Sequence, residues 1–148
     1  MNLMLASTSP YCRRLLERLR LPFTCIDPAV EESIRDGESP QARACRLATE
    51  KVLSVAETLR DGAIVIGSDQ VACLGPQILH KPGTPEAAIA QLTASSGQTV
   101  QFWTAVSLWT SPGEPPTQRV VPCKVKMRTL STGEISRYVA LDQPLHCV

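Results

Sequence analysis

Residues 3–14 read LMLASTSPYCRR, an apolar run that passes through small hydroxyl residues into a basic segment. Residues 2–6 predict a short buried strand, and Ser9 followed by Pro10 predicts the start of a helix over residues 10–21. The first N–H groups of a helix lack intrahelical partners, and the helix dipole is positive at that end. The helix start therefore suits an anion such as phosphate, although a simple capped surface helix has the same pattern.

The composition indicates one globular domain over residues 1–148. The chain is 43% hydrophobic and 20% charged, which is ordinary for a folded protein of this length. Its formal net charge of +1 provides no broad basic field for a nucleic-acid polymer. No apolar run approaches the ~20 residues that cross a bilayer. We therefore expect a protein that binds neither a nucleic-acid polymer nor a membrane.

The cysteines are scattered and form neither a C-x-x-C pair nor a zinc-finger pattern. We therefore expect reduced thiols and a cytoplasmic location. The six positions are Cys12, Cys25, Cys45, Cys73, Cys123 and Cys147.

Apolar periodicity and turn residues predict an α/β chain beyond the opening segment. Residues 27–40 are acidic and rich in turn formers, which predicts an exposed loop. Residues 100–109 and 119–128 flank a proline-rich turn and predict an antiparallel hairpin. The other expected strands cover residues 23–26, 63–67, 71–74 and 78–80, and the other expected helices cover 40–59 and 84–95 and follow the capping-box pattern at 131–134.

Asp69 follows the continuous apolar run of residues 63–67, so we expect it where a buried strand opens into a loop. A carboxylate in that place can bind a metal or take a proton from water, although it can also cap a turn. Glu31 and Glu32 add possible metal ligands, and Lys51 and Lys81 add cations for phosphate. Together these groups suggest a phosphate-ester or phosphoanhydride site that Mg²⁺ would complete.

Short motifs follow one another along the chain in this order: Leu5-Ala6-Ser7-Thr8-Ser9-Pro10, Glu32, Arg46-Leu47-Ala48 with Glu50-Lys51, Ile66-Gly67-Ser68-Asp69-Gln70-Val71, Lys81-Pro82, Ser96-Gly97, and Arg128-Thr129-Leu130-Ser131 with Glu134-Ile135 and Tyr138-Val139. In these motifs the chain resembles the Maf family of nucleotide pyrophosphatases, in its 7-methyl-GTP branch, over nearly its whole length. The resemblance implies a Maf/ITPase-like α/β fold with a mixed twisted sheet flanked by helices.

The Maf resemblance implies hydrolysis of a nucleoside triphosphate between its α and β phosphates, with Mg²⁺ or Mn²⁺ as cofactor. For this branch the reaction converts 7-methyl-GTP to 7-methyl-GMP and diphosphate. By the same resemblance Asp69 is the general base, and Glu32 and Asp69 hold the metal. The substrate and its phosphates would be bound by Ser7, Arg13, Lys51 and Lys81.

Tyr11 and Gln70 fall on positions that separate the 7-methyl-GTP branch from relatives that prefer dTTP and UTP. The ring of 7-methylguanine is positively charged, so the aromatic face of Tyr11 offers a cation–π or stacking contact. The resemblance therefore implies that these two residues set the choice of base.

Two departures from the family pattern keep alternatives open. Cys12 stands where the family usually has arginine, and a thiol lacks the planar fork that binds phosphate. Family members also continue beyond the segment that residues 142–147 resemble, so we expect the C-terminal part of the fold to be missing here. The alternatives are a dTTP or UTP pyrophosphatase and a catalytically impaired nucleotide-binding or cell-division regulatory protein. The assembly suggested by the family is a homodimer.

Overall fold

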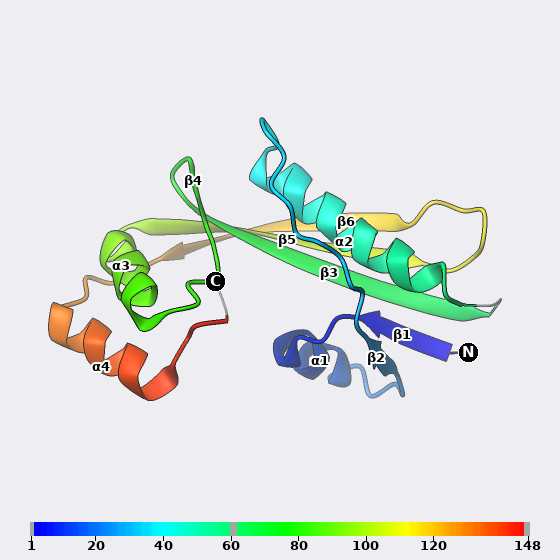
Figure 1. Cartoon of the computed structure of the whole chain (residues 1–148), viewed down its shortest axis with the longest axis horizontal. Coiled ribbons are helices and arrows are strands. Elements are labelled where there is room, and N and C mark those ends of the chain that lie inside the picture. The colour runs from blue at the N-terminus through cyan, green and yellow to red at the C-terminus, as the bar shows by residue number, and fades with distance from the viewer. Residues whose placement is uncertain (1, 60–61, 147–148) are drawn as a thin grey trace. The chain divides into compact units, whose positions relative to one another are not determined.

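A computed structural model describes residues 2–59 and 62–146 of the chain (Figure 1). Its helices and strands alternate as the α/β prediction requires. In chain order they are β1 Asn2–Ala6, α1 Pro10–Glu17, β2 Thr24–Ile26, α2 Pro40–Ala56, β3 Ala63–Leu74, β4 Gln77–Leu79, α3 Pro85–Ser95, β5 Thr99–Trp109, β6 Thr117–Lys126 and α4 Thr132–Asp142.

The strands form a mixed sheet in the order β2-β1-β3-β5-β6, with β4 paired to β3. β1 runs parallel to β2 and to β3, whereas β4 runs antiparallel to β3. The backbone N–H of Met127 donates to the carbonyl of Gln98 at 2.9 Å, so the chain leaving β6 lies beside the chain entering β5. The predicted hairpin and the predicted mixed sheet are both confirmed.

The chain forms two compact units, one of residues 1–70 with 104–121 and the other of residues 71–103 with 122–148. β3, β5 and β6 each contribute residues to both units. The expectation of one domain over residues 1–148 stays a prediction.

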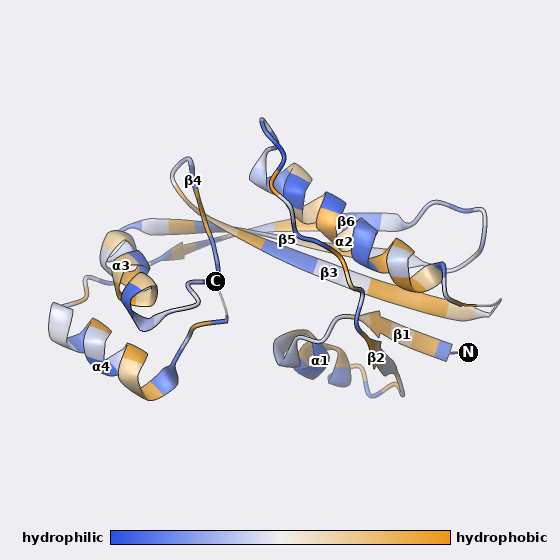
Figure 2. Ribbon diagram, in the orientation of Figure 1, coloured by the Kyte–Doolittle hydropathy of each residue, from blue (hydrophilic) through white to orange (hydrophobic). Residues whose placement is uncertain are grey.

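The core of the first unit lies where α2 packs on the sheet. The apolar positions predicted for this helix are buried, and α2 ends three residues earlier than predicted, at Ala56. Figure 2 shows that β1 and the first half of β3 are largely hydrophobic. The buried cluster comprises Ala6, Val52, Val55, Ala56, Val65 and Trp109.

Gly67 lets α2 approach β3 closely. A Cβ atom at Gly67 would lie 2.6 Å from Cγ2 of Val52 and 2.7 Å from the carbonyl oxygen of Ala48. Both distances are shorter than real Cβ contacts, and the second involves backbone that cannot rotate away. The absence of a side chain at this position therefore fixes how near α2 lies to β3.

We expect Gly67→Ala to lower the free energy of unfolding by about 2 to 3 kcal/mol, because overpacking forces the helix backbone to shift. Gly133→Ala is the matched control, since a Cβ there meets nothing within 4 Å and alanine favours a helix. Urea denaturation of both variants measures the difference. Equal stability of the two variants would contradict the close approach.

The predicted helix over residues 10–21 is too long, because α1 ends at Glu17. Arg20 has a φ of 56°, and Pro22 disfavours helical backbone at the residue before it. The spacing of Leu15, Leu16 and Leu19 predicts an apolar face on this helix. That face is not buried, since Leu15 is 63% exposed and Leu19 is 59% exposed.

The predicted break in the strand at residues 68–70 is wrong, because β3 runs unbroken from Ala63 to Leu74. Each polar side chain of the segment finds a partner on a neighbouring element. Ser68 Oγ donates to the carbonyl of Ala105 at 2.8 Å, and Gln70 Nε2 donates to Thr104 Oγ1 at 2.7 Å. Asp69 therefore lies within a strand and not in a loop.

In the second unit α3 contacts α4, and Gly83 N–H donates to the carbonyl of Leu145 at 2.9 Å. The predicted capping box is confirmed at Ser131 and Glu134. The backbone N–H of Ser131, then Arg128 and the Ser131 hydroxyl, lower the pKa of Glu134 to about 2. Within the described residues no helix is long and apolar enough to cross a membrane.

Candidate active site

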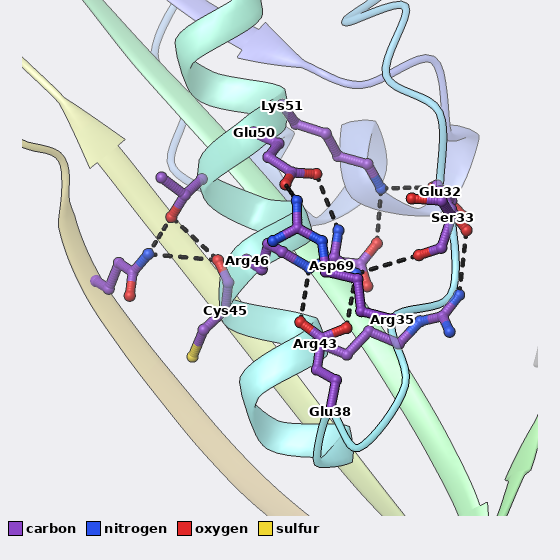
Figure 3. Close-up of polar contacts among 12 residues, drawn as sticks. Glu32, Ser33, Arg35, Glu38, Arg43, Cys45, Arg46, Glu50, Lys51 and Asp69 are labelled. Atoms are coloured by element: carbon purple, nitrogen blue, oxygen red, sulfur yellow. Dashed lines mark hydrogen bonds and ion pairs between the residues drawn. The ribbon is translucent and has the colours of Figure 1, made fainter.

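Lys51 of α2 lies between two carboxylates in the first unit (Figure 3). Its Nζ atom is 2.6 Å from Oδ1 of Asp69 on β3 and 2.8 Å from Oε1 of Glu32 in the loop before α2. The side chains of Lys51 and Asp69 are only 13% and 10% exposed, whereas that of Glu32 is 42% exposed. A helix, a strand and a loop thus converge on one ammonium group.

The two carboxylates keep Lys51 charged. Burial alone would lower the pKa of Lys51, but the charges and hydrogen bonds of Asp69 and Glu32 outweigh burial and raise it. The ammonium group is therefore retained at neutral pH. A retained cation beside two carboxylates suits a site that handles phosphate oxygens.

Two arginines of α2 hold the backbone of the loop that carries Glu32. Arg43 is buried, and its Nη2 donates to the carbonyl of Glu32 at 3.2 Å. Arg46 Nη2 donates to the carbonyl of Ser33 at 3.1 Å. The same guanidinium donates to both carboxylate oxygens of Glu38, through Nε and Nη2, each at 2.6 Å. These arginines therefore tie the loop to α2 at the carbonyls of Glu32 and Ser33 and at the side chain of Glu38.

These arginines were not among the predicted site residues. Their spacing of three positions on one helix face, preceded in the chain by an acidic loop, is the sequence signal that could have indicated them. The hydrogen bond from Arg46 is the main cause of a lowered pKa at Glu38, and Glu38 in turn raises the pKa of Arg46. Figure 3 shows both groups with Glu50, which also contacts Arg46 at 3.1 Å.

The start of α1 lies at the edge of the sheet where β1 ends. The parallel register pairs Leu5 with Ile66, so the chain leaves β1 beside the part of β3 that leads to Asp69. Ser7 Oγ accepts the N–H of Ser9 at 3.1 Å. Ser9 Oγ in turn accepts the N–H of Cys12 at 3.5 Å, so these hydroxyls build the turn and the helix cap.

Tyr11 and Arg13 are exposed on α1. Tyr11 is 58% exposed, which leaves its ring accessible to a ligand. The Arg13 guanidinium pairs with Glu17 one turn along the helix at 3.1 Å. An exposed pair of this kind is weak, so phosphate can compete with Glu17 for Arg13.

Gln70 is not brought together with Lys51 and Asp69. Successive side chains of a strand point to opposite faces, so Gln70 faces away from the side on which Asp69 meets α2. Lys81 follows β4 in the second unit, in the predicted loop. Of the eight predicted site residues, Glu32, Lys51 and Asp69 are in direct contact.

Residues 2–148 match a family model described as Maf-like protein. The chain belongs to the Maf family. It is 52% identical over 99% of its length to a "7-methyl-GTP pyrophosphatase" of Xanthomonas axonopodis pv. citri, and covers 75% of that protein. It is 45% identical to a protein of the same name from Alcanivorax borkumensis, covering 99% of this chain and 74% of the other.

A further Maf relative, a "7-methyl-GTP pyrophosphatase" of Pseudoalteromonas atlantica, is 44% identical over 99% of this chain and 75% of its own length. Among solved structures, that of the Staphylococcus aureus Ham1 protein has a TM-score of 0.50 at 16% identity. The match covers 84% of this chain and 70% of the Ham1 chain. This likeness concerns the fold alone and agrees with the predicted mixed-sheet architecture.

The donor chemistry of the site fits the divalent metal expected of a Maf protein. Mg²⁺ prefers oxygen ligands and is commonly held by one or two carboxylates together with substrate phosphates and water. Glu32 and Asp69 supply two such carboxylates around one cation, Lys51. Among the described residues no group of three or more His, Cys, Asp or Glu side chains is arranged to hold a metal. The two carboxylates therefore fit an ion whose coordination would be completed by the phosphates of a substrate and by water.

Proposed function

We propose that this Maf protein hydrolyses 7-methyl-GTP to 7-methyl-GMP and diphosphate. Three relatives that are 44%, 45% and 52% identical over 99% of the chain bear the name 7-methyl-GTP pyrophosphatase. The observation that carries the proposal is the contact of Lys51 with both Asp69 and Glu32. This arrangement joins a proton acceptor, a cation for phosphate and a second carboxylate in one place.

In the proposed reaction Asp69 accepts a proton from the attacking water. The water oxygen bonds to the α-phosphorus, the bond from that phosphorus to the bridging oxygen breaks, and diphosphate leaves with the bridging oxygen. Lys51 exchanges a carboxylate contact for phosphate oxygens and neutralises their charge. Ser7, Arg13 and Lys81 are further phosphate-binding candidates.

Glu32 and Asp69 would hold Mg²⁺ or Mn²⁺, which neutralises phosphate charge and favours attack on phosphorus when bound. Asp69 is placed on β3 and Glu32 on the loop, so the two carboxylates approach the ion from different elements. Their shared contact with Lys51 keeps both aimed at the same space.

The decisive experiment is release of pyrophosphate from 7-methyl-GTP by the purified chain with Mg²⁺, compared with GTP, dTTP and UTP. The proposal expects the highest kcat/KM with 7-methyl-GTP. Faster turnover of dTTP or UTP would replace the substrate by that of the other branch. Tight binding of 7-methyl-GTP without turnover would favour a catalytically impaired nucleotide-binding protein. The reason to consider this alternative is Cys12, which replaces the arginine usual in the family.

Tyr11 is proposed to select the methylated base by stacking on its positively charged ring. We expect Tyr11→Ala to lower the preference for 7-methyl-GTP over GTP by about 3- to 30-fold, the range of a cation–π contact. Tyr11→Phe keeps the aromatic face and should retain the preference. Competition assays with both nucleotides measure it, and a preference unchanged in Tyr11→Ala would assign the choice of base to other residues such as Gln70.

We also propose a cytoplasmic location and a homodimer. The cysteines that the structure describes, Cys12, Cys25, Cys45, Cys73 and Cys123, are all free thiols, which supports a reducing compartment. Sedimentation of the purified chain tests the dimer.

A further inference from the structure

Glu32 lies in a segment without helix or strand, yet its carboxylate reaches Lys51 at 2.8 Å. A half-exposed glutamate in such a segment loses rotamer and backbone freedom when it is held in one place. The contact with Lys51 fixes only the end of the side chain. The direction in which that side chain leaves the backbone must be set by whatever holds the peptide groups around it.

The two peptide groups that flank Ser33, one of which begins at Glu32, are held from α2. Arg43 Nη2 donates to the Glu32 carbonyl at 3.2 Å, and Arg46 Nη2 donates to the next carbonyl, that of Ser33, at 3.1 Å. A further hydrogen bond within the turn runs from Ser33 N–H to the Glu31 carbonyl at 2.9 Å. The turn centred on Glu32 and the fixed partner of its carbonyl restrict the backbone at Glu32. The contact from Arg46 restricts the adjoining backbone at Ser33.

Arg46 is itself held rigidly. Its guanidinium forms a two-pronged ion pair with Glu38, at 2.6 Å for both nitrogen–oxygen contacts, and both side chains are 12% exposed. A third nitrogen contacts Glu50 at 3.1 Å. Forked, charge-assisted pairs of this kind are the strong and geometrically specific ones. Arg46 thus links the far end of the loop, at Glu38, to the residue next to Glu32.

We propose that Arg46 is a positioning residue that aims Glu32 at Lys51 and Asp69, and thereby sets the geometry of the metal and phosphate site. The proposal rests on the proposed function for its catalytic consequence. The hydrogen bonds from Arg43 and Arg46 to the carbonyls of residues 32–33 form a clamp on the loop, and this clamp is a property of the fold. Arg46 reaches this segment through the carbonyl of Ser33, so we expect its influence on Glu32 to pass through the backbone of residues 32–33.

The test is a double-mutant cycle between Arg46→Gln and Glu32→Gln, with kcat/KM for 7-methyl-GTP and Mg²⁺ as the readout. Arg46→Gln alone is expected to lower kcat/KM by about 10- to 100-fold, as losses of residues that orient ligands do. In the Glu32→Gln background the same change should cost no more than about twofold, the usual scatter of independent effects. Equal losses in both backgrounds would overturn the proposal.

Two further variants separate positioning from general stability. Arg46→Lys keeps the charge but lacks the fork, so its kcat/KM should fall between those of wild type and Arg46→Gln. Arg35→Gln is the matched control, because Arg35 lies in the same loop and contacts Glu50 at 3.0 Å through a side chain that is 60% exposed. Arg35→Gln should stay within about twofold of wild type. A loss as large as that of Arg46→Gln would show that any break in the ion-pair network is enough.

Hydrogen exchange tests the clamp without any assay of activity. In Arg46→Gln the backbone amides of residues 31–34 should exchange at least about tenfold faster than in wild type, since this segment opens locally when its contacts are lost. Amides in the buried part of α2 should be unchanged. Unchanged exchange at residues 31–34 would refute the clamp, whereas a wild type inactive on 7-methyl-GTP with the expected exchange pattern would refute only the proposed function.

Discussion

Replacing Asp69 with asparagine is expected to lower kcat for 7-methyl-GTP by about 10²- to 10⁴-fold, the contribution of a general base. Asparagine has nearly the same shape but accepts a proton poorly from water. The change also removes one of the two carboxylates proposed to hold the metal. Pyrophosphate release with saturating nucleotide and Mg²⁺ measures the loss.

The matched control for this change is Asp36→Asn, the same substitution at an exposed position of the loop before α2. It should leave kcat within about twofold of wild type. Asp69→Asn should still bind nucleotide, because Lys51 is retained. Full activity of Asp69→Asn would remove Asp69 from the reaction and would leave Glu32 as the nearest carboxylate able to take its place.

The second large effect is expected for Lys51→Met, which should lower the free energy of unfolding by about 3 kcal/mol in the presence of EDTA. Removing one partner of a largely buried ion pair leaves the other charge without compensation, and Asp69 is the more buried of the two carboxylates. The half-exposed Glu32 adds little to this figure because water screens it. Urea denaturation gives the difference.

The double variant Lys51→Met/Asp69→Asn is the control, because it removes both charges of the buried pair. It should recover most of the lost stability, since a neutral pair carries no uncompensated charge. Lys124→Met, at an exposed position of β6, should be neutral. If the double variant were no more stable than Lys51→Met, the loss would come from packing and not from charge.

The same comparison has a defined dependence on pH. The folded-state pKa of Lys51 is raised above an ordinary value of about 10.4. Lys51 therefore contributes its full stabilisation below pH ~10.4 and loses it as the pH rises through the higher folded-state pKa. The gap in stability between wild type and Lys51→Met should be constant from about pH 7 to 10 and should narrow above that. A gap that widens at high pH would contradict the ammonium assignment.

The elements that sequence predicts best here are those with strong local signals. The cap at Ser39-Pro40 and the apolar spacing along α2 set that helix, and the box at Ser131 and Glu134 set the start of α4. The overlong helix after Pro10 shows the limit of periodicity. Its leucines have the right spacing, but Leu15 stays exposed within α1, and the helix ends before Leu19.

The site was predicted in part for a related reason. Both the residue pattern and the Maf resemblance indicate Asp69, Lys51 and Glu32. Their contact depends on α2 lying close to β3 at Gly67, which no local pattern encodes. The polar run at residues 68–70 suggested a loop because the partners that satisfy those side chains come from distant parts of the chain. The roles of Arg43 and Arg46 likewise depend on tertiary contacts, which bring α2 against residues 32–33.

Because β3 is continuous at Asp69, the two carboxylates of the site differ in how firmly they are held. The Asp69 carboxylate lies on a hydrogen-bonded strand packed against α2, so its position is fixed before any ligand binds. The other carboxylate lies on an irregular segment that side chains of α2 hold in place, so its position depends on those contacts. Substitutions in residues 27–39 are therefore expected to shift Glu32 while the strand keeps Asp69 in place.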